Sequence, residues 1–340
     1  MGSFTSAGGH GITTATADPD TGALTALATT GSLPDPSYLA LDPDGGPLYA
    51  VSETARGAAA AFARTPEGLR PLGPTTPVGG DGPTHLSVAG PWLLTAHYAS
   101  GGVSTLPRAA DGSLGGPPRV LDHHGSGPDP DRQKGPHAHQ ILPSPDGRWV
   151  LSVDLGTDSL WIAALDPGDG TLTPHSETAL RPGTGPRHLA FHPGGRLLYV
   201  LHELEPVLTV CHWDPATGTA VPATEVRVAD HGPDGARAYP SALVADPAGR
   251  FLWAAVRGTD TLVVLALDPA GTDPRPTATV DCGGTWPRDL ALDPAGRRLY
   301  AANERSGDVT WFAIDPADGR PVRSGSLALP APTCVVLARP

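Results

Sequence analysis

The sequence has little of what builds helices and lacks the segments that mark membrane proteins. Only one Met occurs among 340 residues, whereas Gly (43) and Pro (40), which interrupt helices, are abundant. No apolar run reaches the roughly eighteen residues of a membrane span, and the first residues have neither the basic nor the apolar region of a signal peptide. The sequence therefore predicts strands and turns in a cytoplasmic protein without membrane contact.

Cysteine and positive charge are also scarce. Cys211, Cys282 and Cys334 are odd in number, widely spaced and surrounded by apolar or small residues, so we expect buried thiols and no disulfide or metal framework. The net charge of -12 argues against nucleic acid as a partner but leaves a small anionic substrate open. We expect a monomer or a weak homo-oligomer.

A proline followed by a short strand of alternating apolar residues recurs seven times. Successive copies are about 45 to 54 residues apart, which accommodates four strands and their turns. The seven prolines are Pro36, Pro83, Pro136, Pro186, Pro240, Pro287 and Pro332. Because no helical pattern interrupts these units, the sequence predicts one all-β domain over residues 1–340, a seven-bladed β-propeller with four-stranded blades.

Two sets of turns divide each unit into strands. The first, as in residues 246–249 (Asp-Pro-Ala-Gly), follows the proline-led strand and suits a type I turn closed by glycine. The second, as in residues 214–218 (Asp-Pro-Ala-Thr-Gly), closes the third strand. A final first strand at residues 332–338 has nothing after it, whereas the strands before Pro36 have no first strand. We expect the N-terminal strands to pair with the C-terminal strand and to close the ring.

Two rows of positions vary in charge while the rest of the repeat stays constant. One row begins the first strand of each unit and the other ends the second strand, so the hairpin between them brings both rows to one rim around a central funnel. The first row is Ser37, Thr84, His85, His137, His139, Arg187, His188, Ser241, Arg288, Asp289 and Thr333. The second row is Glu53, His97, Asp154, Glu203, Arg257, Asn303 and Glu304. These positions share no packing role, which makes them candidates for a site.

The residue types in the funnel favour an anionic ligand. Arginine holds carboxylate or phosphate in fixed geometry, histidine titrates near neutrality and a carboxylate can accept a proton. We assign function to Arg187, Glu203 and His139 together. Arg257 and Arg288 could equally form ion pairs between blades.

For the remaining charged positions of the second row we favour a structural role. They are Glu53, His97, Asp154 and Glu304.

The polar connection at residues 122–135 could be a solvated loop or a rim of the site, since it leads directly to His137 and His139. We expect His123, within it, to be solvated. His137 and His139 share one face of the predicted strand, so a metal site is geometrically possible. The neighbouring arginines would repel a cation, and we therefore expect no metal.

Five segments resemble the lactonase family of seven-bladed propellers, which includes propeller-type 6-phosphogluconolactonases and fungal 3-carboxy-cis,cis-muconate lactonising enzymes. They are residues 2–6 (Gly-Ser-Phe-Thr-Ser), 134–140 (Lys-Gly-Pro-His-Ala-His-Gln), 185–193 (Gly-Pro-Arg-His-Leu-Ala-Phe-His-Pro), 286–294 and 302–308. The resemblance extends over essentially the entire chain. It implies a site in the central cleft without metal or cofactor.

The same resemblance implies which residues take part. The family's histidine falls on His139 or His137, its first arginine on Arg187, its glutamate on Glu203 and a later arginine on Arg257. As substrate-binding candidates we take His137, Arg257, Arg288 and Lys134.

Three functions follow from these expectations. The first is hydrolysis of a sugar-acid lactone, by resemblance 6-phosphoglucono-δ-lactone, with Glu203 or His139 as general base and Arg187 with Arg257 binding the anion and the oxyanion. The second is a cycloisomerase that adds a carboxylate across a double bond. The third is a propeller that only binds a ligand or a protein.

Overall fold

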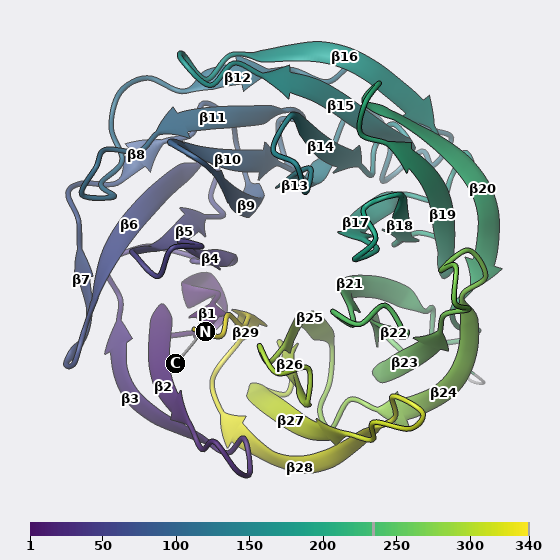
Figure 1. Ribbon diagram of the computed structural model, residues 1–340. Helices are drawn as coiled ribbons and strands as arrows, with labels where there is room; N and C mark the ends of the chain where they lie inside the picture. Colours follow the sequence, from purple (N-terminus) through teal and green to yellow (C-terminus); the bar gives the residue numbers. More distant parts are fainter. Residues whose placement is uncertain (233–234, 339–340) are drawn as a thin grey trace.

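The computed structural model describes residues 1–232 and 235–338, and their regular structure is almost entirely β-strand (Figure 1). The 3-10 helix η1 (Thr5–Ala7) is the one helical element among these residues. The predicted domain bounds, 1–340, extend two residues past the described part. An all-β fold is therefore confirmed.

Six sheets, numbered here in chain order, each contain four consecutive antiparallel strands. Sheet 1 comprises β4 (Leu39–Leu41), β5 (Leu48–Ser52), β6 (Ala58–Thr65) and β7 (Gly68–Pro71), with β8 (Thr76–Pro77) paired to β6. Sheet 2 comprises β9 (Pro83–Ala89), β10 (Trp92–His97), β11 (Val103–Pro107) and β12 (Arg119–Leu121). Sheet 3 comprises β13 (Ala138–Pro143), β14 (Trp149–Asp154), β15 (Ser159–Leu165) and β16 (Leu172–Ala179).

The other three sheets repeat this order. Sheet 4 comprises β17 (Pro186–Phe191), β18 (Leu197–His202), β19 (Val207–Asp214) and β20 (Thr219–Arg227). Sheet 5 comprises β21 (Tyr239–Ala245), β22 (Phe251–Arg257), β23 (Thr261–Ala266) and β24 (Arg275–Asp281). Sheet 6 comprises β25 (Pro287–Leu292), β26 (Arg298–Asn303), β27 (Asp308–Ile314) and β28 (Pro321–Ala328).

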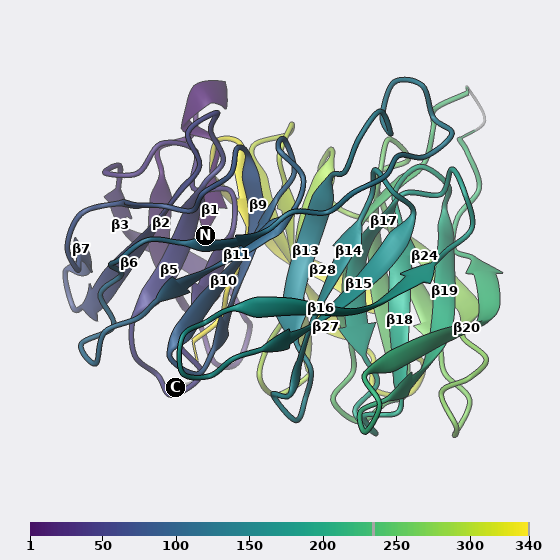
Figure 2. The same cartoon turned by 90° about the horizontal axis from the view of Figure 1, so that it is seen from above.

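The sheets stand around a common axis, with the first strand of each nearest the centre and the fourth on the perimeter (Figures 1 and 2). The apolar cores lie between neighbouring sheets. One of them joins Tyr199 and Leu201 of sheet 4 to Leu252 and Ala254 of sheet 5, all completely buried. Burial of apolar surface between sheets thus stabilises the circular arrangement, and the predicted propeller is confirmed.

The two ends of the chain meet in one short strand pair, and a second pair follows it in the N-terminal part of the chain. Strand β1 (Gly2–Ser3) pairs with β29 (Pro332–Cys334), and β2 (Ile12–Ala17) pairs with β3 (Leu24–Thr30). Two backbone hydrogen bonds join the pairs, from the Met1 amine to the Thr13 carbonyl at 2.9 Å and from the Thr13 amide to the Met1 carbonyl at 2.8 Å.

The proline does not lead directly into the first strand in two units. Strand β4 begins three residues after Pro36, and in sheet 3 the pairing register is displaced as well. In sheet 4, Pro186 pairs with His202 at the end of the hairpin, and in sheet 3 the equivalent pair is Ala138 with Asp154. Strand β13 therefore begins two residues after Pro136, with His137 outside it, and the two histidines do not share one face of a strand. Pro136 was misleading because proline is also common in loops.

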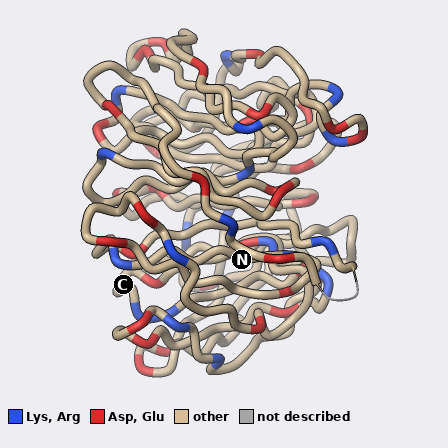
Figure 3. Tube along the Cα trace, turned by 90° about the vertical axis from the view of Figure 1, so that its right-hand side faces the viewer, with Lys and Arg blue, Asp and Glu red and all other residues tan. Residues whose placement is uncertain are grey.

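All three cysteines are free and buried, as expected. Acidic and basic residues are interspersed along the trace in Figure 3. Among the described residues, no helix has the length and apolarity that crossing a membrane requires.

Candidate functional site

Strand pairing sorts the second row into two levels. We compare positions along the second strands, counted from the residue pair that ends each hairpin, and call this position the height. The upper level is the residue directly after the second strand: Glu53 in sheet 1, Tyr98 in sheet 2, Glu203 in sheet 4 and Glu304 in sheet 6. In sheet 5, Arg257 has the same height. His97 and Asp154 lie one residue lower, at the height of His202 and Asn303.

That lower level has a structural role, as favoured for His97 and Asp154. All four of its residues named here are completely buried. The His97 Nε2 lies 2.9 Å from the Thr95 hydroxyl, and Asn303 donates to the Thr310 hydroxyl at 2.9 Å. Because side chains alternate across a strand, one residue of displacement turns a side chain away from the funnel and into the framework.

Glu203 lies at the centre of an arginine cluster. It follows β18, is 4% exposed, and its Oε2 accepts a hydrogen bond from Arg187 Nε at 3.0 Å. Arg257 Nη2 lies 2.8 Å from the same oxygen, and Arg132 Nη2 donates to Oε1 at 2.7 Å. Burial alone would raise the pKa of Glu203, but Arg257, Arg187 and Arg132 outweigh it and lower that pKa well below its ordinary value. Glu203 is therefore a firmly ionised carboxylate.

Arg187 extends from β17 between sheets 4 and 5. It is 2% exposed, and its Nη1 donates to the backbone carbonyl of Ser241. Burial and the neighbouring Arg257 lower its pKa to about 9. The guanidinium is thus fixed by one carboxylate and one carbonyl, and it remains charged at neutral pH.

Arg132 and Tyr98 belong to this cluster although the sequence patterns did not predict them. Arg132 comes from the connection at residues 122–135, and its Nη2 donates to the Tyr98 hydroxyl at 2.9 Å as well as to Glu203. The Tyr98 ring stacks on His137 with 4.6 Å between ring centroids. The position of the loop directly before His137 was the available signal for Arg132, and counting one residue past His97 would have found Tyr98.

Arg288 occupies the far side of the funnel, between two glutamates. Its Nη1 lies 3.4 Å from Glu304 Oε2 and its Nη2 lies 3.5 Å from Glu53 Oε1, so it bridges sheets 6 and 1. The Arg288 guanidinium also lies over the Phe4 ring, 4.8 Å from its centroid. Four arginines, three glutamates and the Asp289 carboxyl therefore lie around the axis, and the positive excess is confined to Arg132, Arg187 and Arg257 around Glu203.

His139 occupies in sheet 3 the strand position that Arg187 occupies in sheet 4, and both side chains line a small cavity on the axis. That cavity has a volume of about 10 Å³, which is room for about one water molecule. It is lined by Ser37, Tyr38, Thr84, His139, Arg187, His188, Arg288, Asp289 and Thr333. The imidazole is buried and its Nδ1 has no hydrogen-bond partner among the described residues. Burial, followed by the field of Arg187, Arg288 and Arg257, lowers the pKa of His139 well below its ordinary value and keeps the ring neutral.

His137 is held at the edge of the cluster. Its backbone amide donates to Asp154 Oδ1 at 2.8 Å and its Nδ1 lies 2.6 Å from the Tyr98 carbonyl. The other Asp154 oxygen lies 2.7 Å from His123 Nδ1, and His123 stacks on Trp161. The expectation that His123 is solvated is therefore wrong, because this histidine is buried, bonded to Asp154 and stacked on Trp161.

Lys134 is exposed and forms no ion pair with any residue of the described ranges. Nowhere in residues 1–232 and 235–338 do three His, Cys, Asp or Glu side chains gather in a group that could hold a metal ion.

These features define a class: a β-propeller with a buried, arginine-rich polar site on its axis. The family described as "Lactonase, 7-bladed beta-propeller" matches residues 1–337, and the chain belongs to that family. The 6-phosphogluconolactonase of Bacillus subtilis is 32% identical over 293 residues, which cover 84% of this chain and 82% of the relative.

Solved structures agree with this family. A putative 6-phosphogluconolactonase from Bacteroides fragilis superposes with a TM-score of 0.91 at 28% identity, covering 98% of this chain and 95% of that one. A periplasmic gluconolactonase from Pseudomonas aeruginosa has a TM-score of 0.89 at 29% identity, with 98% and 96% covered.

Proposed function

We propose that this protein hydrolyses a sugar-acid lactone, with 6-phosphoglucono-δ-lactone as the best candidate substrate. The observation that carries the proposal is the arginine cluster around Glu203 on the axis of an otherwise acidic protein. Arginine recognises phosphate and carboxylate in bidentate geometry. The names of the relatives, which refer to 6-phosphogluconolactonase and gluconolactonase, support the same substrate class.

Glu203 serves in this proposal as the residue that positions the arginines. Both of its oxygens are already bonded, and a carboxylate with a strongly lowered pKa is a poor acceptor of a proton from water. Removing it would leave the buried guanidiniums of Arg187 and Arg257, with the partly exposed Arg132 beside them, to repel one another. Arg187 and Arg257, aligned by Glu203, would bind the anionic group and stabilise the oxyanion of the tetrahedral intermediate.

His139 is the better candidate for the general base. Its ring is neutral, its Nδ1 is unbonded and it lines a cavity that can hold about one water molecule. The arginines that keep the ring neutral also make protonation costly. A bound phosphate would offset their charge and raise the pKa of His139, so substrate binding itself would make the base effective.

The test is a turnover assay on the purified protein with 6-phosphoglucono-δ-lactone and glucono-δ-lactone, corrected for spontaneous hydrolysis. We expect faster turnover of the phosphorylated lactone. The alternative cycloisomerase would instead lactonise a carboxymuconate, and a binding propeller would retain ligand without turnover. No acceleration with either lactone would reject the proposal.

Four further expectations belong to the same proposal. The pairs β29–β1 and β2–β3 act together as a seventh blade that closes the ring of a single domain, supported by the bonds between Met1 and Thr13. The reaction needs no metal or cofactor, because the arginines surrounding the histidines would oppose a cation. His137, Arg288 and Lys134 assist in substrate binding. The protein works in the cytoplasm, as a monomer or weak homo-oligomer.

A further inference from the structure

Trp286 directly precedes β25 and adopts a backbone conformation that a bulky residue rarely takes. Its φ of 65° lies in the left-handed region, where any side chain larger than that of glycine crowds the backbone. At the same place before the first strand, sheets 2 and 4 have Gly82 and Gly185, with φ of 56° and 62°. The turn therefore requires this conformation, and tryptophan is an unfavourable residue to keep there. Strain of this kind points to a function for the side chain that causes it.

The half-buried Trp286 ring lies next to the arginine cluster. The guanidinium carbon of Arg257, which contacts Glu203, is 5.4 Å from the centroid of this ring. The backbone of Trp286 is held on both sides, because its amide donates to Asp260 Oδ1 at 2.8 Å and its carbonyl accepts from the Glu304 amide at 3.1 Å. The ring is thus a fixed wall beside the outer part of the cluster.

Arg305, in the connection after the second strand of sheet 6, stacks on this ring. Its guanidinium carbon is 3.4 Å from the ring centroid, which is direct contact with the face of the indole. Arg305 is exposed, and within residues 1–232 and 235–338 its guanidinium has no hydrogen-bond or ion-pair partner. The preceding residue, Glu304, contacts Arg288 instead. Arg305 therefore offers its N–H donors to solvent while Trp286 fixes the plane of the guanidinium.

Arg257 also has donor capacity left. Its Nη2 contacts Glu203 at 2.8 Å and its Nε donates to the Tyr239 carbonyl at 3.3 Å, whereas its Nη1 has no partner in the described part of the chain. The guanidinium carbons of Arg257 and Arg305 lie 5.4 and 3.4 Å from one ring centroid, so they are no further apart than those two distances combined. A phosphate has enough acceptor oxygens to bind two such guanidiniums at once.

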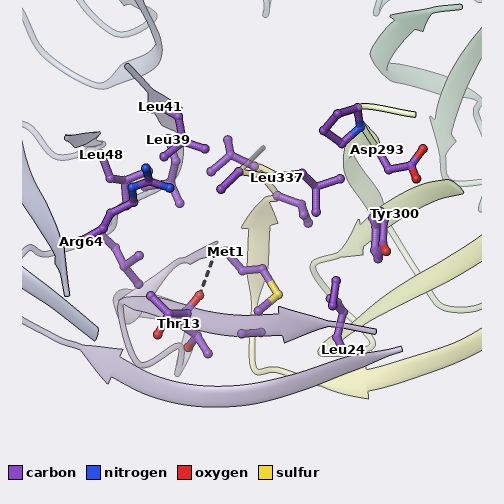
Figure 4. A pocket seen from close by; sticks show the side chains of 18 of the residues that line it. Met1, Thr13, Leu24, Leu39, Leu41, Leu48, Arg64, Asp293, Tyr300 and Leu337 are labelled. Atoms are coloured by element: carbon purple, nitrogen blue, oxygen red, sulfur yellow. Dashed lines mark hydrogen bonds between the residues drawn. The ribbon is translucent and has the colours of Figure 1, made fainter. Parts of the chain in front are cut away.

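A cavity of about 570 Å³ lies elsewhere in the ring, next to β2 and residues 335–338 (Figure 4). Its surroundings are mainly apolar and include Leu39, Leu48 and Leu337. Apolar walls do not compensate a phosphate for its lost hydration, so the rim beside Trp286 is the better place for one.

We propose that Arg305, held in place by Trp286, binds the phosphate of the substrate and thereby sets a preference for phosphorylated sugar lactones. The phosphate would lie between Arg305 and Arg257 at the rim, and the lactone ring would extend from there into the funnel toward His139. Trp286 is a positioning residue, since it acts through Arg305. This inference rests on the proposed lactonase function and adds to it the residue that recognises the phosphate.

The test compares turnover of 6-phosphoglucono-δ-lactone and glucono-δ-lactone by the native protein and Arg305→Gln. The KM for the phosphorylated lactone should rise about tenfold or more, because a charged hydrogen bond is lost. The kcat/KM for glucono-δ-lactone should stay unchanged. Arg56→Gln is the matched control, since Arg56 is exposed in the connection after the second strand of sheet 1, and it should change neither value.

Two variants test the positioning role of Trp286. Trp286→Gly restores the Gly-Pro pair that sheets 2 and 4 have, so the backbone is relaxed, yet the KM for the phosphorylated lactone should rise as in Arg305→Gln. Trp286→Phe keeps an aromatic ring under the guanidinium and should restore most of the native affinity. Urea unfolding would establish that the variants are folded. A merely structural role for Trp286 would leave the ratio of the two KM values unchanged.

The outcomes separate this inference from the lactonase proposal. If the native protein turns over the phosphorylated lactone and folded Arg305→Gln has the same KM, the role of Arg305 is overturned and the lactonase function stands. If neither lactone is turned over, the lactonase function fails, and calorimetric titration with 6-phosphogluconate tests Arg305 by itself. The native protein should then bind 6-phosphogluconate at least about tenfold more tightly than Arg305→Gln. Equal affinities, or no binding to the native protein at millimolar concentration, would overturn the phosphate site.

Discussion

Replacing Glu203 by glutamine removes the carboxylate that contacts Arg187, Arg257 and Arg132 while keeping the size of the side chain. Removing one partner of a buried ion pair costs about 3–5 kcal/mol, because the remaining charge stays buried without compensation. We expect the free energy of unfolding of Glu203→Gln to fall by about that amount at pH 7. Urea unfolding followed by tryptophan fluorescence would measure it.

Two further observations separate the roles of Glu203. Because its folded pKa lies below the ordinary value of 4.5, its stabilisation is complete above pH 4.5 and is lost as the pH falls toward the folded pKa. The difference in unfolding free energy between the native protein and Glu203→Gln should therefore shrink below pH 4.5. If Glu203 only positions the arginines, the variant should also keep the pH dependence of kcat/KM while its KM rises.

Glu53→Gln is the matched control, since Glu53 faces Arg288 at 3.5 Å in a more exposed setting. It should cost less than about 1 kcal/mol. A Glu203→Gln protein as stable as this control would refute the account of the arginine cluster. Loss of the acidic limb of kcat/KM in Glu203→Gln would instead identify Glu203 as the base.

Four other predictions follow from the site. His139→Gln should lower kcat by roughly 10²–10⁴-fold with the fold retained, and a fully active variant would exclude His139 as the base. In the native protein, kcat/KM should stay constant as the pH falls to about 6.5, because the pKa of His139 is lowered. Arg132→Met should raise KM about 10- to 100-fold, because it removes the charged hydrogen bond to Glu203, which aligns the other arginines. Arg148→Met, at an exposed turn, should leave KM unchanged. Burial raises the pKa of Asp289 to about 7 from 3.8, so the free energy of unfolding should fall as the pH rises between those values. Urea unfolding of the native protein at pH 4 to 8 should show this decline, of up to about 4 kcal/mol, and Asp289→Asn should lack it. Identical pH profiles of unfolding free energy for the two proteins would contradict this. Finally, incubation with EDTA should leave lactone turnover intact, and inactivation restored by a divalent metal would argue against a metal-independent site.

The sequence by itself determined the repeating architecture. Recurrent prolines and two kinds of turn marked four-stranded units, because turn chemistry and period-two alternation are local properties of the chain. They also placed Arg187 and Glu203 at the open ends of one hairpin, since the two strands of a hairpin run side by side. No comparable pattern marked the start of β13, where Pro136 belongs to the loop.

Only the tertiary structure decided which side chains meet on the axis. Pairing register fixed whether His97 or Tyr98 faces the site, and a difference of one residue turns a side chain to the opposite face of its sheet. Arg132 reaches Glu203 from a loop that follows no repeat, and Asp154 holds His123, from the start of the same loop, in a buried position. Such contacts depend on how separate sheets are arranged around the ring, and no local pattern encodes that arrangement.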